Sequence, residues 1–113
     1  MTPEHRVMNE IRLWCGNHDI LCFRTNVGKV NLATGGYFDT GLPTGFPDLL
    51  ILPGEGLIIF CEVKSAVGRQ RPEQIEFEKL VKKRGYKYII SHSLEEFISQ
   101  INYMNLVQTH IMS

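Results

Sequence analysis

The sequence has little cysteine, and its three thiols show no pattern that would bind metal or form a disulfide framework. The number is odd, and no two cysteines have the Cys-x-x-Cys spacing of a zinc or redox motif. Each thiol lies in an apolar context, which predicts a small buried side chain. We therefore expect neither a zinc site nor disulfides from Cys15, Cys22 and Cys61.

Several other signals are absent as well. No apolar run is long enough to span a bilayer, and the N-terminus lacks the hydrophobic segment of a secretion signal. There is no glycine-rich phosphate loop, and Ser65 and Ser91 have no histidine–acid partner pattern. These absences argue against a membrane protein, a nucleotide cofactor and a serine hydrolase. They predict an intracellular, cytoplasmic protein.

Net charge is zero, but the basic residues are unevenly distributed. Between residues 63 and 87 eight basic residues stand against three acidic ones, a surplus that could follow a phosphate backbone. An exposed helix face explains the lysines from 79 to 83 equally well. The basic residues are Lys64, Arg69, Arg71, Lys79, Lys82, Lys83, Arg84 and Lys87.

Length and apolar periodicity predict one α/β domain over residues 1–113, with a core at about 4–101. Turn and capping residues give the order α-β-β-β-α-β-α, a mixed β-sheet flanked by helices. Residues 31–45 are rich in glycine and threonine and predict a loop. Residues 106–113 carry no strong signal and are either a tail or a dimer contact. The helices are 2–16, 72–85 and one from 93 past 101; the strands are 20–27, 46–52, 57–64 and 86–90.

Two carboxylates and a lysine lie within the apolar strands. Asp48 precedes Leu-Leu-Ile-Leu, and Glu62 and Lys64 end the run that follows the turn Pro-Gly-Glu-Gly. Such groups are seldom buried without partners. A hairpin would place Asp48 beside Glu62, with Lys64 on the same face. The two carboxylates and the Val63 carbonyl could then hold Mg²⁺ or Mn²⁺, so that a metal-activated water attacks a phosphodiester near Lys64.

Two further residues could join this site from the helices. Glu10 lies at the margin of the first helix's apolar stripe, where it could help to hold the metal. Glu4 lies at the opposite margin, and we interpret it as a favourable charge at the helix N-terminus. Gln74 stands at the third position of the second helix, where it either serves the helix end or turns toward Lys64.

These residues together resemble the VRR-NUC (virus-type replication-repair nuclease) family of the PD-(D/E)xK nuclease superfamily. The resemblance rests on Gly-Phe-Pro-Asp at 45–48, Cys-Glu-Val-Lys at 61–64, residues 68–74 and the early Glu10, and it covers residues 4–101. It implies a restriction-endonuclease-like fold. It also implies that Glu10, Asp48, Glu62, Lys64 and Gln74 form the active site.

The resemblance further implies a stand-alone, phage-type Mg²⁺- or Mn²⁺-dependent endodeoxyribonuclease. Such an enzyme would act as a homodimer on branched DNA such as four-way (Holliday) junctions, in the host cytoplasm if phage-encoded. Residues 24–28 resemble the segment before the family's variable loop, where we expect substrate contact. The predicted DNA contacts are Arg24, Asn26, Lys29, Arg69 and Arg71.

Two rival interpretations remain open from the sequence. The chain could be a structure-selective DNA-binding protein that does not cleave, or the acid–lysine cluster could be an ion-pair network alone. The four histidines are interpreted as surface or capping residues. Tyr37 and Phe38 could stack on an unpaired base, but we favour packing against the core.

Overall fold

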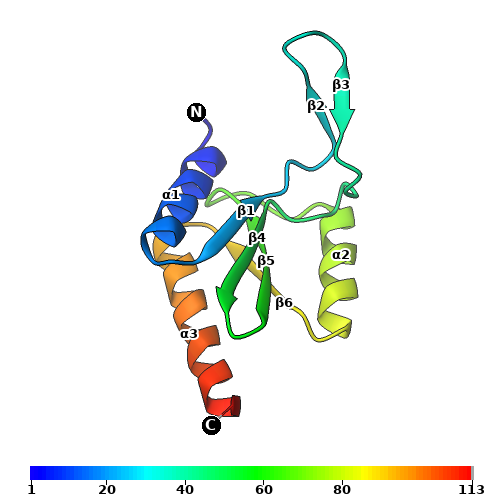
Figure 1. Ribbon diagram of the computed structural model, residues 1–113. Coiled ribbons are helices and arrows are strands. Elements are labelled where there is room, and N and C mark those ends of the chain that lie inside the picture. Colours follow the sequence, from blue (N-terminus) through cyan, green and yellow to red (C-terminus); the bar gives the residue numbers. More distant parts are fainter. Residues whose placement is uncertain (113) are drawn as a thin grey trace.

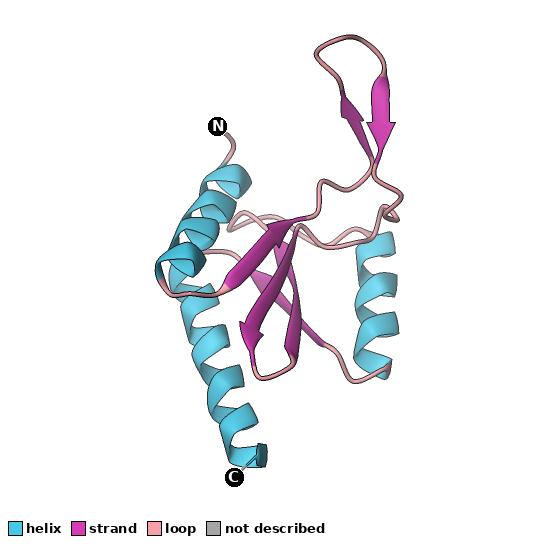
Figure 2. Cartoon of the chain, in the orientation of Figure 1, coloured by secondary structure: helices cyan, strands magenta, loops and turns pink. Residues whose placement is uncertain are grey.

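The computed structural model describes residues 1–112. It describes the side chains of all of these residues except 29, 30, 38 and 105–112. A four-stranded mixed sheet of order β1-β4-β5-β6 lies between helices (Figures 1 and 2). Strands β1, β4 and β5 are antiparallel neighbours, and β6 pairs parallel to β5. The elements are α1 (Pro3–Asn17), β1 (Leu21–Arg24), β2 (Lys29–Asn31), β3 (Tyr37–Asp39), β4 (Leu49–Gly54), β5 (Leu57–Val63), α2 (Pro72–Lys83), β6 (Lys87–Ser91) and α3 (Leu94–Met112).

The predicted α/β class and the order of the main elements are confirmed, and two details differ. The stretch expected to be a loop contains β3, which pairs with β2 to form a small separate hairpin. Strands of three residues are too short to show an apolar period, so the pattern did not reveal them. The last helix continues to Met112, so the expected tail is helical to that point, and the alternative of a dimer contact stays a prediction. None of the helices in the described part of the chain is long and apolar enough to cross a membrane.

One face of the sheet carries the main core. Helices α1 and α3 cover this face, and Phe97 and Ile101 from α3 are almost completely buried. Their partners are the alternate residues of β4 and β5, since side chains two apart point to the same side. The largest contributions from the sheet and α1 are Ile11, Leu49, Ile51, Ile59 and Cys61.

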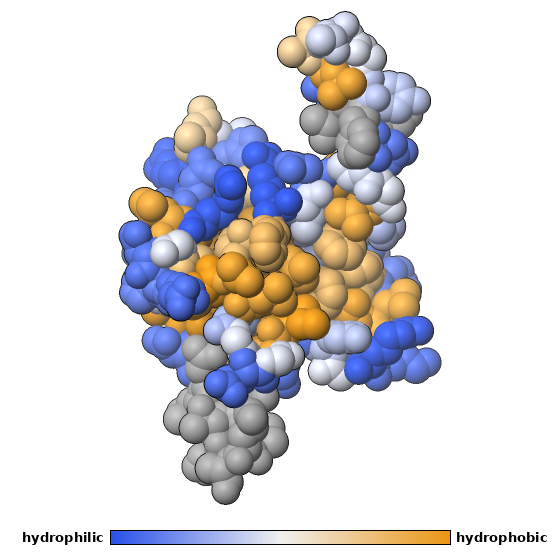
Figure 3. All heavy atoms as spheres, viewed as in Figure 1, coloured by the Kyte–Doolittle hydropathy of each residue, from blue (hydrophilic) through white to orange (hydrophobic). Residues whose placement is uncertain are grey.

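The opposite face is only partly covered. Helix α2 packs over it through an aromatic cluster in which the ring centroids of Phe46, Phe60 and Phe77 lie 5.0–5.7 Å apart. Toward β1 no helix covers the sheet, and Leu21 and Phe23 are more than half exposed. Figure 3 shows an apolar surface over this half of the sheet.

A tight turn and a β-bulge together fix the register between β4 and β5. Glu55 and Gly56 both have positive φ angles, 58° and 75°, as a two-residue hairpin turn requires. The register then shifts by one residue between Ile51 and Gly54, and the ladder beyond this irregularity pairs Leu49 with Cys61. In an antiparallel ladder the next residues outward, Asp48 and Glu62, then stand opposite each other.

Gly45 brings the segment before β4 against the start of α2. A Cβ atom at this position would lie 2.2 Å from the main-chain oxygen of Glu73. Only glycine allows so close an approach between the two backbones. The segment that carries Asp48 and the helix end that carries Gln74 are therefore held together by a residue with no side chain.

We expect Gly45→Ala to push this segment away from α2. The new methyl group meets backbone, which cannot move aside, so unfolding free energy should fall by about 1–3 kcal/mol. Thermal or urea unfolding measures the loss. Gly16→Ala is a matched control, because a Cβ atom there has nothing within 4 Å. Equal stability of the two variants would contradict the close contact.

Candidate active site

The two acidic residues lie side by side at one end of the β4–β5 ladder. Asp48 Oδ2 accepts a hydrogen bond of 3.0 Å from the Val63 main-chain N–H. Thr25 holds Asp48 from the other side, because its N–H donates to the Asp48 carbonyl at 3.0 Å. Its hydroxyl also donates to the Pro47 carbonyl at 2.7 Å. The Asp48 carboxylate is thus fixed beside the end of β5.

Glu62 is a buried acid without sufficient hydrogen bonds. Its side chain is 2% exposed, and Oε2 has no hydrogen-bond partner among the described residues. Burial raises the pKa of Glu62 to about 9, and the neighbouring Asp48 carboxyl adds to the rise, while the charges of Lys64 and Arg71 oppose it. Leaving such a group unpaired is costly, so the site favours a proton or a cation here.

Lys64 is the third member of the group. It lies two residues after Glu62, on the same face of the strand, and is 8% exposed. Its main-chain N–H donates to the Ser91 carbonyl at 3.1 Å, which fixes the backbone at this point. Its ammonium group makes no hydrogen bond or ion pair with the part of the chain that the structure describes. The amine is therefore available to a ligand.

The donor set fits a hard divalent cation. The described residues contain no group of three His, Cys, Asp or Glu side chains that could hold a metal. Asp48 and Glu62 offer two carboxylates, and the Val63 carbonyl belongs to the residue next to Glu62. Mg²⁺ is commonly bound by one or two carboxylates and keeps several waters, so a third side-chain ligand is not required. The orphaned Glu62 Oε2 is the observation that supports this fit.

Gln74 serves the helix end and also faces the site. Its Oε1 accepts a hydrogen bond of 2.8 Å from the Arg71 main-chain N–H at the start of α2. The side chain is 3% exposed and nevertheless lines a cavity that also contains Asp48. Gln74 can therefore serve both functions considered from the sequence. Its side-chain oxygen caps the helix, and its amide nitrogen can still donate a hydrogen bond to a ligand.

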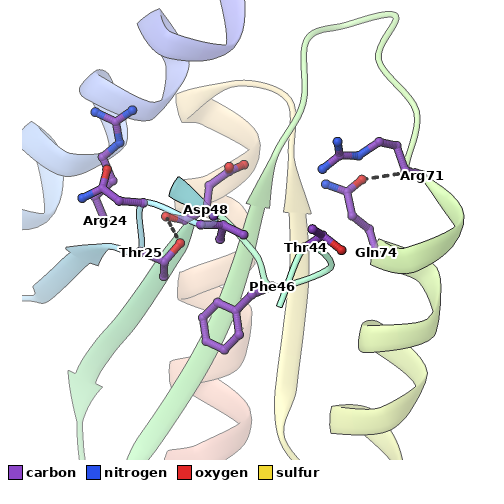
Figure 4. Close-up of a pocket in the computed structure, with 10 residues that line it drawn as sticks. Arg24, Thr25, Thr44, Phe46, Asp48, Arg71 and Gln74 are labelled. Atoms are coloured by element: carbon purple, nitrogen blue, oxygen red, sulfur yellow. Dashed lines mark hydrogen bonds between the residues drawn. The ribbon is translucent and has the colours of Figure 1, made fainter. Parts of the chain in front are cut away.

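This cavity, of about 650 Å³, is framed by two parts of the chain (Figure 4). Arg24, Thr25 and Asp48 line it on the side of the sheet, and Arg71 and Gln74 line it on the side of α2. The walls carry two arginines and are not apolar, which suits an anionic ligand. Glu62 and Lys64 are not among the described lining residues.

The structure leaves Glu10 outside this group. It is exposed and is not among the described residues that line either cavity beside Asp48. Helix α1 instead brings Glu4 to the site, together with His5. A second cavity of about 160 Å³ is lined by Glu4, His5, Arg24, Asp48 and Val63. Glu4 lies in the first turn of α1, as expected of a charge at the helix N-terminus, and it also lines this cavity.

Some of the predicted DNA contacts lie at the larger cavity and others do not. Arg24, Asn26 and Arg71 line the larger cavity, and Arg24 also lies 3.2 Å from His5 Nε2. Arg69 is exposed and is not among the described lining residues. The Lys29 side chain lies outside the described residues. Sequence reasoning missed Thr25 as a support for Asp48, although its position at the end of a strand was a usable signal.

Comparisons with known proteins give one informative result. No family model and no curated protein matches the chain. A solved structure described as a "VRR_NUC domain" superposes with a TM-score of 0.69 and 23% sequence identity, over 90% of this chain and 97% of that one. This likeness confirms the fold that the resemblance implied: the chain folds like the VRR_NUC domain.

The raised pKa of Glu62 predicts a pH-dependent stability. Between pH 4.5 and about 9 the folded protein retains a proton that the unfolded chain has lost, so the metal-free protein should lose stability as pH rises. Glu62→Gln carries no such proton and should be less sensitive to pH. Thermal melts of both proteins in EDTA from pH 5 to pH 9 test this, and parallel curves would contradict it.

The same melts test the metal. At pH 8, Mg²⁺ at ten times its Kd should stabilise the parent protein by about 1.4 kcal/mol, or roughly 5 °C, since binding to the folded state alone shifts the equilibrium. Glu62→Gln should show little of this rise. An equal rise in both proteins would show that the ion binds elsewhere, and no rise in either would favour an ion-pair network.

Proposed function

We propose that this chain is a VRR-NUC-type, metal-dependent endodeoxyribonuclease that hydrolyses phosphodiester bonds in branched DNA. One observation carries the proposal: Glu62 is buried with its Oε2 unpartnered among the described residues, and it lies opposite Asp48 with Lys64 on the same face. A structural network would be expected to pair these groups internally. The fold of a VRR_NUC domain supports the same conclusion.

The proposed metal is Mg²⁺ or Mn²⁺, held by Asp48, Glu62 and the Val63 carbonyl. When bound, it would supply a Lewis acid for the scissile phosphate and the attacking water. Glu4 lies near Asp48 and is proposed to orient water or a ligand of the metal from α1. This function replaces the one that the sequence suggested for Glu10.

The remaining side chains have separate functions in the proposal. Lys64 Nζ holds a proton beside the reacting phosphate, orients the water and stabilises negative charge as it develops. Gln74 positions the same water or a phosphate oxygen through its amide nitrogen, because its oxygen is engaged at the helix end. Arg24 and Arg71 bind neighbouring phosphates from the two walls of the cavity.

The proposal also includes an oligomeric state, a homodimer, and a substrate, the four-way junction. A homodimer would present two sites related by two-fold symmetry, which suits two cuts in a four-way junction. The chain has an exposed apolar surface on which a second copy could pack, formed around Leu21 and Phe23 of β1. Exposed patches of this kind commonly mark protein interfaces.

Substitutions at the acidic pair should separate cleavage from binding. Asp48→Asn and Glu62→Gln should abolish detectable cleavage of a synthetic four-way junction in Mg²⁺ or Mn²⁺, while DNA binding persists. Lys64→Ala should lower the rate by about 10²–10³-fold, because it removes one electrostatic stabiliser. Gel assays with EDTA, linear-duplex, flap and single-strand controls measure these effects.

Two outcomes would contradict this assignment. Cleavage by Asp48→Asn at the parent rate would place the chemistry elsewhere. A parent protein that binds the junction in Mg²⁺ and Mn²⁺ but never cuts it would be a structure-selective binding protein instead.

Helix α1 offers a matched pair of variants. Glu4→Gln should lower the cleavage rate by about tenfold or more, and Glu10→Gln should leave it unchanged, because only Glu4 lies beside Asp48. Both substitutions remove one negative charge from the same helix. Single-turnover rates on the junction compare them. A loss confined to Glu10→Gln would restore the assignment made from the sequence.

A further inference from the structure

The β2–β3 hairpin projects from the protein body next to the candidate site. Figure 1 shows it extending away from the sheet and the helices. Its two strands contact each other and no other helix or strand that the structure describes. An isolated two-stranded hairpin is marginally stable in water. Such an element contributes nothing to the core, which leaves it available for another function.

The base of the hairpin is tied to the cavity. The Thr40 N–H donates to the Gly28 carbonyl at 3.0 Å, which closes the two strands at their root. Asn26, Val27 and Gly28 line the same cavity as Asp48. A ligand whose phosphate lies beside Asp48 would therefore pass the root of the hairpin.

The tip is uncharged and exposes one large aliphatic side chain. Residues 31–37 contain no acidic or basic side chain, so the tip is unsuited to following phosphates. It nevertheless exposes Leu32, at 48%, where the strand enters the turn. Tyr37, expected in the core, is 58% exposed on the neighbouring strand, and the Phe38 side chain lies outside the described residues. Gly35 and Gly36 keep the turn narrow.

A narrow, uncharged turn with an exposed leucine suits insertion between bases. Proteins that open or kink DNA place leucine, phenylalanine or similar wedges between base steps. The insertion is easiest where stacking is already interrupted, because less stacking energy is lost there. Branch points provide such an interruption, and continuous duplex does not.

We propose that the β2–β3 hairpin selects branched DNA by inserting Leu32 at the branch point while the phosphodiester lies beside Asp48. This inference rests on the proposed nuclease function and assigns the choice of substrate to a separate element. About five residues of extended strand separate root and tip, or roughly 17 Å. With about 3.4 Å per nucleotide along a strand, cuts should fall within about five nucleotides of the branch.

The test uses two changes in the hairpin and one control. Leu32→Ser removes the wedge, and replacement of residues 30–38 by Asn-Gly shortens the hairpin with a turn that suits two residues. Leu13→Ser is the control, since Leu13 is also exposed but lies on α1. All three should melt within a few degrees of the parent, because these residues pack against little.

The first measurement does not depend on cleavage. A junction with 2-aminopurine at the branch is titrated in EDTA, where the probe brightens when it is unstacked. The parent protein and Leu13→Ser should raise the fluorescence, and both hairpin variants should not. A parent protein that leaves the fluorescence unchanged overturns the inference.

The second measurement is the ratio of cleavage rates on the junction and on continuous duplex in Mg²⁺. Both hairpin variants should lower this ratio at least tenfold, with cuts no longer grouped near the branch. An unchanged ratio, with cleavage intact, overturns the inference and leaves the nuclease proposal standing. Absence of cleavage by the parent protein, with a normal 2-aminopurine response, overturns the nuclease proposal instead.

A protein partner for the hairpin is the competing explanation. Light scattering gives the mass of the parent and the shortened protein. If shortening reduced the mass while junction selection stayed unchanged, the hairpin would be a contact between copies of the chain, and the inference would be wrong. Equal masses together with lost selection support it.

Discussion

The pairing of β4 with β5 is the constraint on which the candidate site depends. A shift of one residue in this ladder would turn Glu62 and Lys64 to the other face of the sheet, among the core residues. The two-residue turn at Glu55 and Gly56 and the register shift between Ile51 and Gly54 together set this pairing, and the bond from the Val63 N–H to Asp48 Oδ2 completes it. The same backbone geometry that orders the core thus places the two carboxylates together.

The helices complete the site from two directions because each is anchored by a different feature. Gly45 lets α2 approach the segment before Asp48, which brings Gln74 and Arg71 to the cavity. Helix α1 packs against the other face of the sheet, and its first turn brings Glu4 to the side of Asp48. The backbone contacts that pack the helices against the sheet therefore also bring the side chains of the candidate site together.

Whether a contact could be predicted from the sequence depends on how far apart its residues lie along the chain. The meeting of Asp48 with Glu62 was predictable, because one short turn joins two apolar runs. Glu4 was not, since a helical wheel gives an angle about the axis and not the position along it. Glu10 lies six residues, about 9 Å, further along α1. The β2–β3 hairpin was missed because strands of three residues carry no periodic signal.

The burial of Glu62 links stability to function. In the absence of a cation Glu62 is buried beside Asp48, and its Oε2 has no hydrogen-bond partner among the described residues. Burial and the neighbouring Asp48 raise the pKa of Glu62, which opposes folding at neutral pH. A cation bound there relieves this penalty. Metal binding would therefore stabilise the folded protein by an amount that includes the cost of burying Glu62. The same burial keeps water from screening Lys64, which strengthens its effect on a nearby phosphate. An exposed carboxylate pair would fold more easily and would bind and polarise its ligand less well.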